Sequence, residues 1–472
     1  MSKMELAFAP AWLLADLIAA KKLSPVELTE RFLKRIEELN PTLNAYLTVT
    51  GDEAIAVASR AEEALVKGKE LGPLHGVPIS IKDLELTKGV RTTLGSLVFQ
   101  EYVPDMDSII VERVQRAGAI VLGKTNTSEL GLSGTTENYL GDACRNPWNR
   151  EYTAGGSSGG AGAAVAAGLC PLATGSDGGG SIRIPSSFCG VYGIKPSQGR
   201  VPRYGGVSRP APGHFSQSGP MARTVKDAAI LLQVLAGPDH RDVTCMKETP
   251  PDFVAVLSHE VRGLKIGWSR DLGYAVVDPE VVKVTEDSAR AFEEMGCGVE
   301  EVDVALEEPF EAFWTLFSTN AYTSYGHLLE SSDALLTDYV KYTLEYGRDV
   351  KGSSYARAIW YRDQLQGKME RLMGRYDLLL TSTMAVPAFP IGHRPQRIGG
   401  REVDPFWGFV AFTFPFNMTG QPAASIPCGF SRGGLPIGLQ IVGRRGDEAT
   451  VLRASAAFEQ SRPWADKRPP IA

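Results

Sequence analysis

The sequence predicts a large α/β/α sandwich, in which a mixed, mostly parallel β-sheet is covered by helices on both faces. Strand-like and helix-like segments alternate along the chain, which is typical of this fold class. A hydrophobic content of 43% supplies enough apolar side chains for a sizeable core. The length of 472 residues would allow about three domains at ~150 residues each. Because large α/β enzymes often use one bigger unit, we expect residues 1–472 to form a single domain.

Residues 1–70 are expected to form an N-terminal helical region. Ser24, Pro25 and Glu27 match a helix N-cap, a first-turn proline and a capping-box acid. Apolar residues then recur at helical spacing up to residues 40–41: Leu28, Phe32, Ile36 and Leu39. A second helix, rich in Ala, Glu and Lys, is predicted around residues 52–68.

The next segment, residues 71–245, begins with a predicted strand. Val77, Ile79 and Ile81 alternate with small or polar residues, the period of a strand with one apolar face. Lys82 therefore falls on the polar face at the end of that strand. Later in the segment, Thr224 begins a predicted helix that stops at residues 237–238.

Residues 246–410 carry a predicted β-α-β unit, with a strand over 264–268, a helix over 281–294 and a strand over 298–304. The rest of this region has few motifs, and we expect it to form a lid or the wall of a substrate pocket. Its candidate aromatic residues are Trp314, Tyr322, Tyr325, Tyr355, Trp360, Tyr361, Phe389 and Trp407. Residues 411–472 return to the sheet through a predicted strand over 435–442 and a helix over 447–460.

The charge, the N-terminal residues and the cysteines of the chain argue against several classes of function. A net charge of −6 and a pI near 5.7, without a run of Lys or Arg, argue against direct binding to nucleic acid or to an anionic membrane. The N-terminal residues show no signal peptide and no 18-residue apolar run, so we expect a cytoplasmic protein. Six dispersed cysteines predict neither a zinc site nor a disulfide framework: Cys144, Cys170, Cys189, Cys245, Cys297 and Cys428.

The stretch from Gly155 to Pro196 is the most informative part of the chain, because it sets serines among closely spaced glycines. Glycine lets backbone N–H groups converge on a developing negative charge beside a hydroxyl nucleophile. A flexible Gly/Ser linker is the alternative. The apolar runs VAAGLCPLA and VYGIKP within the stretch argue against a linker.

Two common motifs match this chain formally. Gly118–Thr125 fits the phosphate-binding pattern GxxxxGK[ST], but its AIVL segment is itself a predicted strand rather than a turn. GxSxG occurs at 155–159 and 156–160, yet the preceding residues 149–154 are polar rather than a buried strand. Five histidines follow, so counting leaves a histidine base open: His214, His240, His259, His327 and His393.

A third arrangement uses lysine as the base. A hydroxyl becomes a good nucleophile only when a base removes its proton, and lysine can do this if burial lowers its pKa. Lys82 is the candidate, although the spacing alone does not connect it to serines that lie 75 and 99 positions later.

Five segments in order resemble the amidase signature family of serine hydrolases. They are HGVPISIKD at 75–83, GKTNTSELGLSGTTEN at 123–138, RNPWN at 145–149, the Gly/Ser stretch, and the NMTGQPAASIPCGF and GLPIGLQIVG runs within 417–443. The resemblance implies that residues 71–245 form the signature core and that the fold is that of the family.

The resemblance also implies a set of site residues. Ser181 would be the nucleophile, Ser157 the bridging serine held by a cis peptide, and Lys82 the base. The backbone N–H groups of Gly178, Gly179, Gly180 and Ser181 would form an oxyanion hole. Supporting roles fall on Ser158, Asp177 and Arg183. A larger residue is common at Gly178 in the family, so this chain is expected to have extra space there; Gly131, Leu132 and Ser133 are the candidate pocket wall.

The implied reaction is hydrolysis of the C–N bond of small, hydrophobic or aryl amides through an acyl-enzyme, without a metal or organic cofactor. Carbamates and esters present a similar carbonyl. The alternative is the glutamine-hydrolysing component of a tRNA-dependent amidotransferase complex. Such components typically carry glutamine after the signature arginine, whereas this chain has Ile184, which favours a freestanding amidase. The expected partner is a small-molecule amide, and dimers are frequent among similar enzymes, so a homodimer is also expected.

Overall fold

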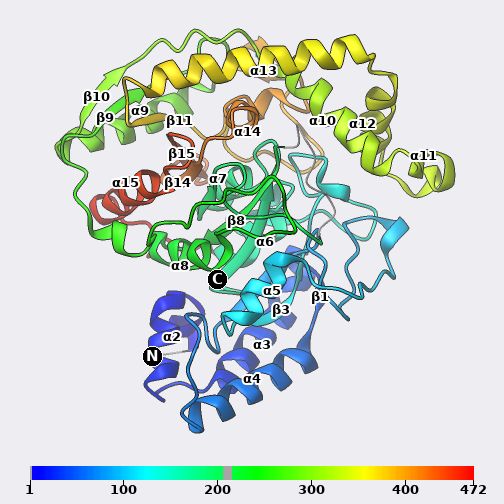
Figure 1. The fold of residues 1–472 in the computed structure, drawn as a ribbon, viewed down its shortest axis with the longest axis vertical. Coiled ribbons are helices and arrows are strands. Elements are labelled where there is room, and N and C mark those ends of the chain that lie inside the picture. The colour runs from blue at the N-terminus through cyan, green and yellow to red at the C-terminus, as the bar shows by residue number, and fades with distance from the viewer. Residues whose placement is uncertain (1–2, 206–214, 472) are drawn as a thin grey trace.

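The computed structural model describes residues 3–205 and 215–471, and its centre is an eleven-stranded β-sheet (Figure 1). Within these residues the strand order is β1-β3-β2-β6-β8-β7-β14-β15-β11-β9-β10. The strands are β1 (Tyr46–Val49), β2 (Pro78–Lys82), β3 (Ile120–Thr125), β6 (Leu172–Asp177), β7 (Tyr192–Lys195), β8 (Gln217–Ala222), β9 (Lys265–Trp268), β10 (Gly298–Glu301), β11 (Leu378–Ser382), β14 (Ala423–Phe430) and β15 (Pro436–Gly443). Two short pairs lie outside the sheet, β4 (Arg145–Asn146) with β5 (Asn149–Thr153) and β12 (Arg397–Ile398) with β13 (Arg401–Glu402).

Parallel and antiparallel strand pairs occupy different parts of the sheet. β3, β2 and β6 are parallel neighbours on one flank, and β11, β9 and β10 are parallel neighbours on the other. The pairs from β6 across to β11 are antiparallel. Parallel neighbours need a crossover, and α5 (Ile109–Arg116) and α9 (Pro279–Glu294) supply one on each flank. The predicted mixed sheet is confirmed. Its parallel strand pairs lie on the two flanks, and β1 adds an antiparallel pair with β3 at one edge.

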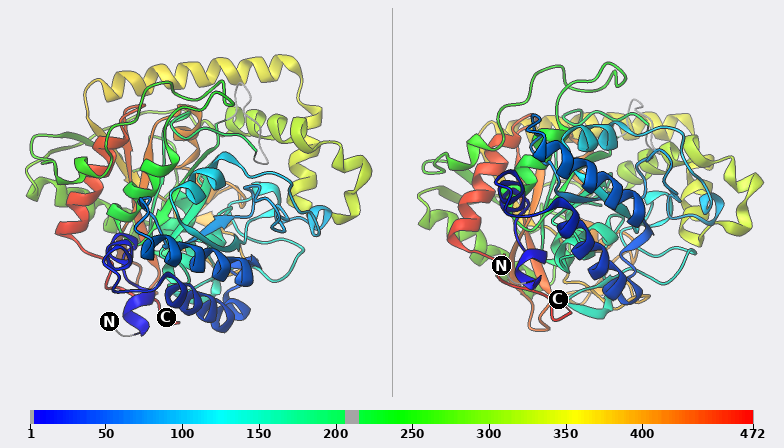
Figure 2. Two further views of the ribbon diagram at one scale, coloured as in Figure 1. Left: turned by 60° about the horizontal axis from the view of Figure 1, so that its bottom comes forward. Right: turned by 90° about the horizontal axis from the view of Figure 1, so that it is seen from below.

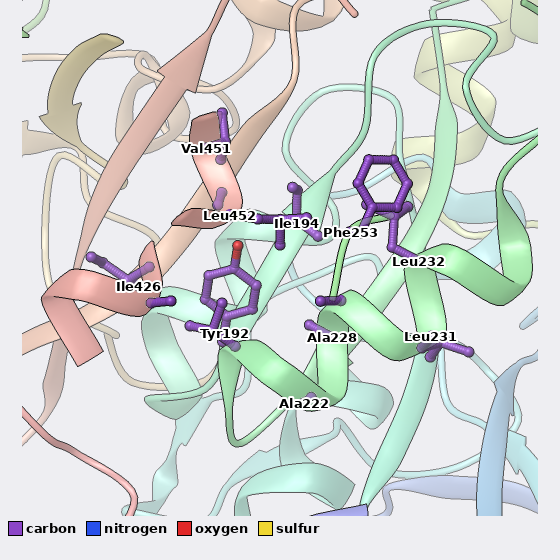
Figure 3. Packing of buried hydrophobic residues seen from close by; sticks show 14 of the residues in the cluster. Tyr192, Ile194, Ala222, Ala228, Leu231, Leu232, Phe253, Ile426, Val451 and Leu452 are labelled. Carbon is purple, nitrogen blue, oxygen red and sulfur yellow. The ribbon is translucent and has the colours of Figure 1, made fainter. Parts of the chain in front are cut away.

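Helices cover both faces of the sheet, as predicted. Side chains alternate between the faces of a strand, and in β11 Leu378 and Leu380 join one buried cluster while Leu379 joins another. The first cluster, shown around Tyr192 in Figure 3, packs against α5, α8 (Val225–Leu235), α9 and α15 (Glu448–Ser461). The clusters on the opposite face involve α2 (Ala11–Ala19), α3 (Pro25–Leu43), α6 (Gly159–Ala166), α7 (Arg183–Cys189), α10 (Phe310–Tyr325), α13 (Gly352–Met373) and α14 (Phe414–Met418).

The N-terminal helices follow the predicted start signals. The Ser24 hydroxyl caps α3 by accepting hydrogen bonds from the N–H groups of Val26 and Glu27. The helix runs past its predicted end at Pro41, because Asn44 closes it in a left-handed conformation and donates its N–H to the Asn40 carbonyl. The second predicted helix is α4 (Gly51–Val66), and a short helix α1 (Lys3–Ala7) precedes α2.

The later predicted elements are present with small shifts in their ends. β9, α9 and β10 form the β-α-β unit, although β10 ends at Glu301 rather than 304. The Thr224 hydroxyl caps α8 by accepting the N–H of Asp227. β15 and α15 complete the chain next to its start, and the views in Figure 2 show the two ends side by side. There the Arg468 guanidinium lies 4.5 Å from the centre of the Phe8 ring.

A helical layer covers one end of the molecule and positions the site wall. α10 packs against α12 (Asp338–Asp349) and α13, and α11 (Leu328–Ser331) joins α10 to α12 (Figure 1). Four aromatic residues of α10, Phe310, Phe313, Trp314 and Phe317, form an aromatic cluster with Trp407 and Phe414, with ring centroids 4.7–6.4 Å apart. Over residues 3–205 and 215–471, no helix is long and apolar enough to cross a membrane.

Candidate active site

Lys82 ends β2 with its side chain fully buried among hydroxyl groups. Its Nζ lies 2.7 Å from Ser157 Oγ, 2.8 Å from Ser158 Oγ and 3.0 Å from Ser176 Oγ. The sequence predicted a strand with one apolar face, but every residue of β2 is buried. Its polar face therefore meets a buried hydroxyl cluster rather than water, because neighbouring strands and α6 cover it.

This burial changes the acid–base chemistry of Lys82. Desolvation lowers the pKa of its amine from 10.5 to about 7, although the negative charges of Asp177 and Glu85 act in the opposite direction. A substantial fraction of the side chain is therefore neutral near pH 7. A neutral amine 2.7 Å from a serine hydroxyl can accept that hydroxyl's proton.

Ser157 and Ser158 lie in a tight turn that leads into α6. The peptide bond between Gly156 and Ser157 is cis. A Cβ at Gly156 would lie 2.5 Å from the carbonyl carbon of Thr135, so only glycine fits beside that segment. The N–H of Ser158 donates to the Ser181 carbonyl at 3.2 Å. This bond ties the first serine turn to the second one.

Ser181 lies in the turn between the end of β6 and the start of α7. Its side chain is 9% exposed and lines the same pocket as Ser157. Gly180, just before it, has φ of 135°, and a Cβ there would lie 2.5 Å from Thr413 Oγ1. Glycine is thus required at this point of the turn.

The glycine turn carries backbone N–H groups that differ in their partners. Gly180 donates its N–H to Asp177 Oδ1 at 2.7 Å. This bond corrects the expectation that Gly180 belongs to an oxyanion hole, because the carboxylate already occupies that donor. Within the described chain, the N–H groups of Gly178, Gly179 and Ser181 have no acceptor. These three remain candidates to bind an oxyanion.

Asp177 and Arg183, both predicted in supporting roles, form an ion pair next to this turn, and the Asp177 carboxylate accepts N–H groups of the turn. Both are buried, and Arg183 Nε and Nη2 donate to the Asp177 carboxylate at 2.9 Å each. Burial raises the pKa of Asp177, but the Arg183 charge and its hydrogen bonds outweigh this effect and bring it to about 2. The carboxylate is therefore ionised throughout the neutral range.

Two further residues complete this network and were not singled out from the sequence. Asn417 Nδ2 donates to Asp177 Oδ1 at 2.9 Å, and Gln440 Oε1 accepts from Arg183 Nη1 at 2.7 Å. Both lie in the C-terminal segments that resemble the family, at 417–443. Their place in those segments was the available signal, but it does not say what they contact.

The pocket above the serines is mostly apolar. Its lining consists of Leu84, Leu130, Gly131, Leu132, Ser157, Ser176, Gly178, Ser181, Phe215, Ser216, Phe317, Asn320, Ala321, Ser324 and Tyr325. Gly131 and Leu132 were predicted there, as was Gly178 beside the turn. Ser133 does not line it, because its hydroxyl accepts a hydrogen bond from Arg394 Nη2 at 3.0 Å.

Of the predicted aromatic residues, Tyr325 alone belongs to the described lining. Trp314 and Trp407 lie in the aromatic cluster that α10 helps to form, and Trp360 is 64% exposed on α13. Phe215 and Phe317 line the pocket and were not predicted. Phe317 could have been predicted only from its position on one face of a helix. The spacing of the aromatic residues alone does not show that face.

The competing motif interpretations find no support in the geometry. Lys124 of the formal phosphate-binding match is buried and donates to the Glu85 carbonyl at 2.6 Å and to Thr92 Oγ1 at 2.8 Å. The segment before it is strand β3, as predicted. His240, His259, His327 and His393 are exposed and none lines the pocket. His214 lies outside the described residues.

A buried lysine lies beside serine hydroxyls under a glycine-rich turn, at the carboxyl ends of the parallel strands β2 and β6. This arrangement provides the chemistry of a serine hydrolase. The comparison with known proteins makes this more specific. The family model for Amidase matches residues 27–452. The chain therefore belongs to the amidase family, hydrolases that act on C–N bonds.

Relatives and solved structures cover almost the whole chain. An acylamidase from Rhodococcus erythropolis is 38% identical over 99% of this chain and 98% of its own length. One component of the glutamyl-tRNA(Gln) amidotransferase from Moorella thermoacetica is also 38% identical, over 99% of both chains. The crystal structure of a bacterial aryl acylamidase of the amidase signature family superposes with a TM-score of 0.92 at 34% identity, covering 97% of both chains. Similarity alone thus leaves the substrate open.

Proposed function

We propose that this protein is a freestanding amidase that hydrolyses small, hydrophobic or aryl amides at Ser181. The observation that carries the proposal is the 2.7 Å contact between Lys82 Nζ and Ser157 Oγ, beneath a pocket that Ser157 and Ser181 share. A pKa of about 7 gives Lys82 the neutral form that a base needs.

In the proposed reaction, protons move along the two serines. Ser181 Oγ bonds to the amide carbon while its proton passes to Ser157, and the proton of Ser157 passes to Lys82. As the C–N bond breaks, the proton returns through Ser157 to the leaving amine. Water then attacks the Ser181 ester by the same relay and releases the acid. No other proton donor is needed at any step.

The negative oxygen of the tetrahedral intermediate requires hydrogen-bond donors. In this proposal the N–H groups of Gly178, Gly179 and Ser181 donate to that oxygen, whereas the N–H of Gly180 already donates to Asp177. Asp177, held by Arg183, keeps the turn in shape without touching the substrate. Ser158 has a supporting role, because its hydroxyl lies 2.8 Å from Lys82 Nζ.

The lining of the pocket supports neutral substrates. Six of the described lining residues have apolar side chains, which would cover a hydrocarbon or aryl group: Leu84, Leu130, Leu132, Phe215, Phe317 and Ala321. Among the described lining residues there is no Asp, Glu, Lys or Arg. A carbamate or ester with an apolar body would suit the same pocket and the same acyl transfer.

A second candidate function is glutamine hydrolysis in an amidotransferase complex, favoured by relatives such as the Moorella thermoacetica protein. Free glutamine carries an ammonium and a carboxylate, and both are costly to bury without a counter-charge. The uncharged lining therefore speaks for the amidase, as does Ile184 after the signature arginine.

Release of amine or ammonia by the purified chain tests the two functions directly. The substrates are an aryl amide, an aliphatic amide, an aryl carbamate and glutamine, with the Ser181→Ala variant as control. We expect turnover of the hydrophobic amides and none in the control. Turnover of glutamine alone, or of nothing when the chain is assayed without partner proteins, would instead support the amidotransferase function.

A further inference from the structure

One face of α10 forms a wall of the pocket. Phe317, Asn320, Ala321 and Ser324 all belong to the lining, and their spacing of three, four and seven residues is that of a single helix face. The helix is anchored by the aromatic cluster, in which its Phe313 stacks on Phe414 with ring centroids 4.7 Å apart. The face is thus presented to the pocket by a fixed support.

On this face Asn320 carries a carboxamide, whereas Phe317 and Ala321 are apolar and Ser324 carries a hydroxyl. Its side chain is half-buried, and its amide makes no hydrogen bond to any residue in the described parts of the chain. By contrast, Thr319 and Thr323 on the same helix donate their hydroxyls to backbone carbonyls one turn earlier. A carboxamide can both donate and accept, so Asn320 can bind a neutral polar group of either kind.

We infer that Asn320 is a specificity-determining residue, which selects amides whose apolar body carries a second, neutral hydrogen-bonding group. This inference rests on the proposed amidase function. The lack of charged groups in the described lining argues for a neutral group such as a hydroxyl or a second amide, because a charged one would be buried without a partner. Asn320 lies on a wall and not in the hydroxyl cluster, so it acts on substrate choice rather than on proton transfer.

Matched substrates test the inference. One pair is acetanilide and para-hydroxymethyl acetanilide, which differ on the amine side; the other is propionanilide and its terminally hydroxylated acyl analogue. We expect wild-type kcat/KM to favour the hydroxylated member of at least one pair by roughly 3- to 10-fold, the value of one neutral hydrogen bond. In Asn320→Leu, which keeps the side-chain size, that ratio should fall to about one.

Two controls separate the possible failures. Thr323→Ala, on the exposed side of α10, should keep both the wild-type ratio and the wild-type rate on the unsubstituted amides. A circular dichroism spectrum and a Tm that match those of the wild type show that Asn320→Leu is folded. Equal ratios in the wild type and in Asn320→Leu would overturn the inference while leaving the amidase function standing. Absence of turnover on the anilides and also on the aliphatic amide and the aryl carbamate of the panel, with the wild type folded, would overturn the amidase function and this inference with it. If only the aliphatic amide is turned over, the same comparison is made with that amide and its hydroxylated analogue.

Discussion

At the scale of single residues, three buried lysines show how partners decide chemistry. Lys82, Lys124 and Lys195 are all fully buried, and burial lowers the pKa of each, to about 7, 8 and 7. Lys195 donates to two backbone carbonyls, which can only accept. Lys124 donates to a carbonyl and to a threonine hydroxyl, and its Nζ lies 3.6 Å from Asp83 Oδ1. Lys82 faces serine hydroxyls that can give up a proton. Its surroundings suit a base, whereas those of the other two suit a structural role, in which the amine donates hydrogen bonds and accepts no proton from a hydroxyl.

The role of Lys82 predicts a pH profile. If its neutral form is required, kcat/KM should rise with pH through about 7 and then level off, since the amine loses its proton in that range. Lys82→Met should lower kcat/KM by about 10²- to 10⁴-fold and remove that rise. Both follow from initial rates on an aryl amide between pH 5.5 and 9. A wild-type rate that falls over this range would rule out a lysine base.

Adjacent glycines of the Ser181 turn should respond differently to alanine. A Cβ at Gly178 would lie 3.3 Å from Ser216 Cβ and 3.8 Å from the Phe317 ring, inside the pocket. Gly178→Ala should therefore fold normally and lower kcat/KM mainly for bulky amides. At Gly180, by contrast, a Cβ would lie 2.5 Å from Thr413 Oγ1, and φ is 135°, a backbone conformation that alanine rarely adopts. Gly180→Ala should therefore lower the free energy of unfolding by about 1–3 kcal/mol and also lose activity. Urea unfolding measures the stability of both variants, and kcat/KM on small and bulky amides measures their activity. Similar losses of stability and of activity in the two variants would contradict the predicted difference between Gly178 and Gly180.

The sequence could indicate most residues of the site only through its family resemblance. Periodicity put Lys82 at the end of a strand, but the burial of that strand on both faces depends on β3, β6 and α6, which come later in the chain. Ser133 was predicted in the pocket wall together with Gly131 and Leu132, but it is not among the described lining residues, and its hydroxyl accepts a hydrogen bond from Arg394. Asn417 and Gln440 reach the turn from more than 230 positions away. Spacing in the chain says nothing of such contacts.

At the scale of elements, the turn between β6 and α7 depends on a buried ion pair. Removing one partner of such a pair leaves an uncompensated buried charge. Arg183→Leu should therefore cost about 3–5 kcal/mol in the free energy of unfolding, measured in urea at pH 7. It should also abolish activity, because the turn that carries Ser181 loses its brace.

The same ion pair has a pH signature that separates charge from packing. The pKa of Asp177 is lower in the folded state, about 2 against 3.8, so its stabilisation is present above pH 3.8 and is lost as pH falls toward 2. Asp177→Asn removes this dependence. If it unfolds with the same acid sensitivity as the wild type, the carboxylate is not what holds the turn.

Elements with strong local signals were predicted well, and their arrangement was not. Ser24 and Thr224 cap their helices as their sequence contexts indicate. Local signals do not state that β7 lies between β8 and β14, or that parallel pairs are confined to the flanks. These pairings join segments far apart in the chain and depend on the packing of the whole sheet. The pocket face of α10 was missed for the same reason, because only the aromatic residues of the region 246–410 were proposed as its pocket wall.

At the scale of the whole molecule, the sheet joins the catalytic half of the chain to its C-terminal end. Lys195 ends β7 and donates to the carbonyls of Pro196 and Gln421, so it ties the centre of the sheet to the segment before β14. Burial lowers its pKa most, and the positive charge of Arg183 lowers it further, to about 7. The folded protein therefore releases a proton that the unfolded chain keeps up to about pH 10.5.

This difference makes stability depend on pH in a direction that can be measured. Between pH 7 and 10.5 the unfolded chain binds more protons at Lys195 than the folded protein does, so this residue makes the free energy of unfolding rise with pH. The slope is at most about 1.4 kcal/mol per pH unit for one group. Urea unfolding of the wild type and of Lys195→Met at pH 7.5, 8.0 and 8.5 isolates it, because other titrating groups act alike in both proteins. We expect the stability of the variant relative to the wild type to decrease by up to that amount per unit over this range. A constant difference would mean that the side chain stays charged in the folded sheet, held by its two carbonyls.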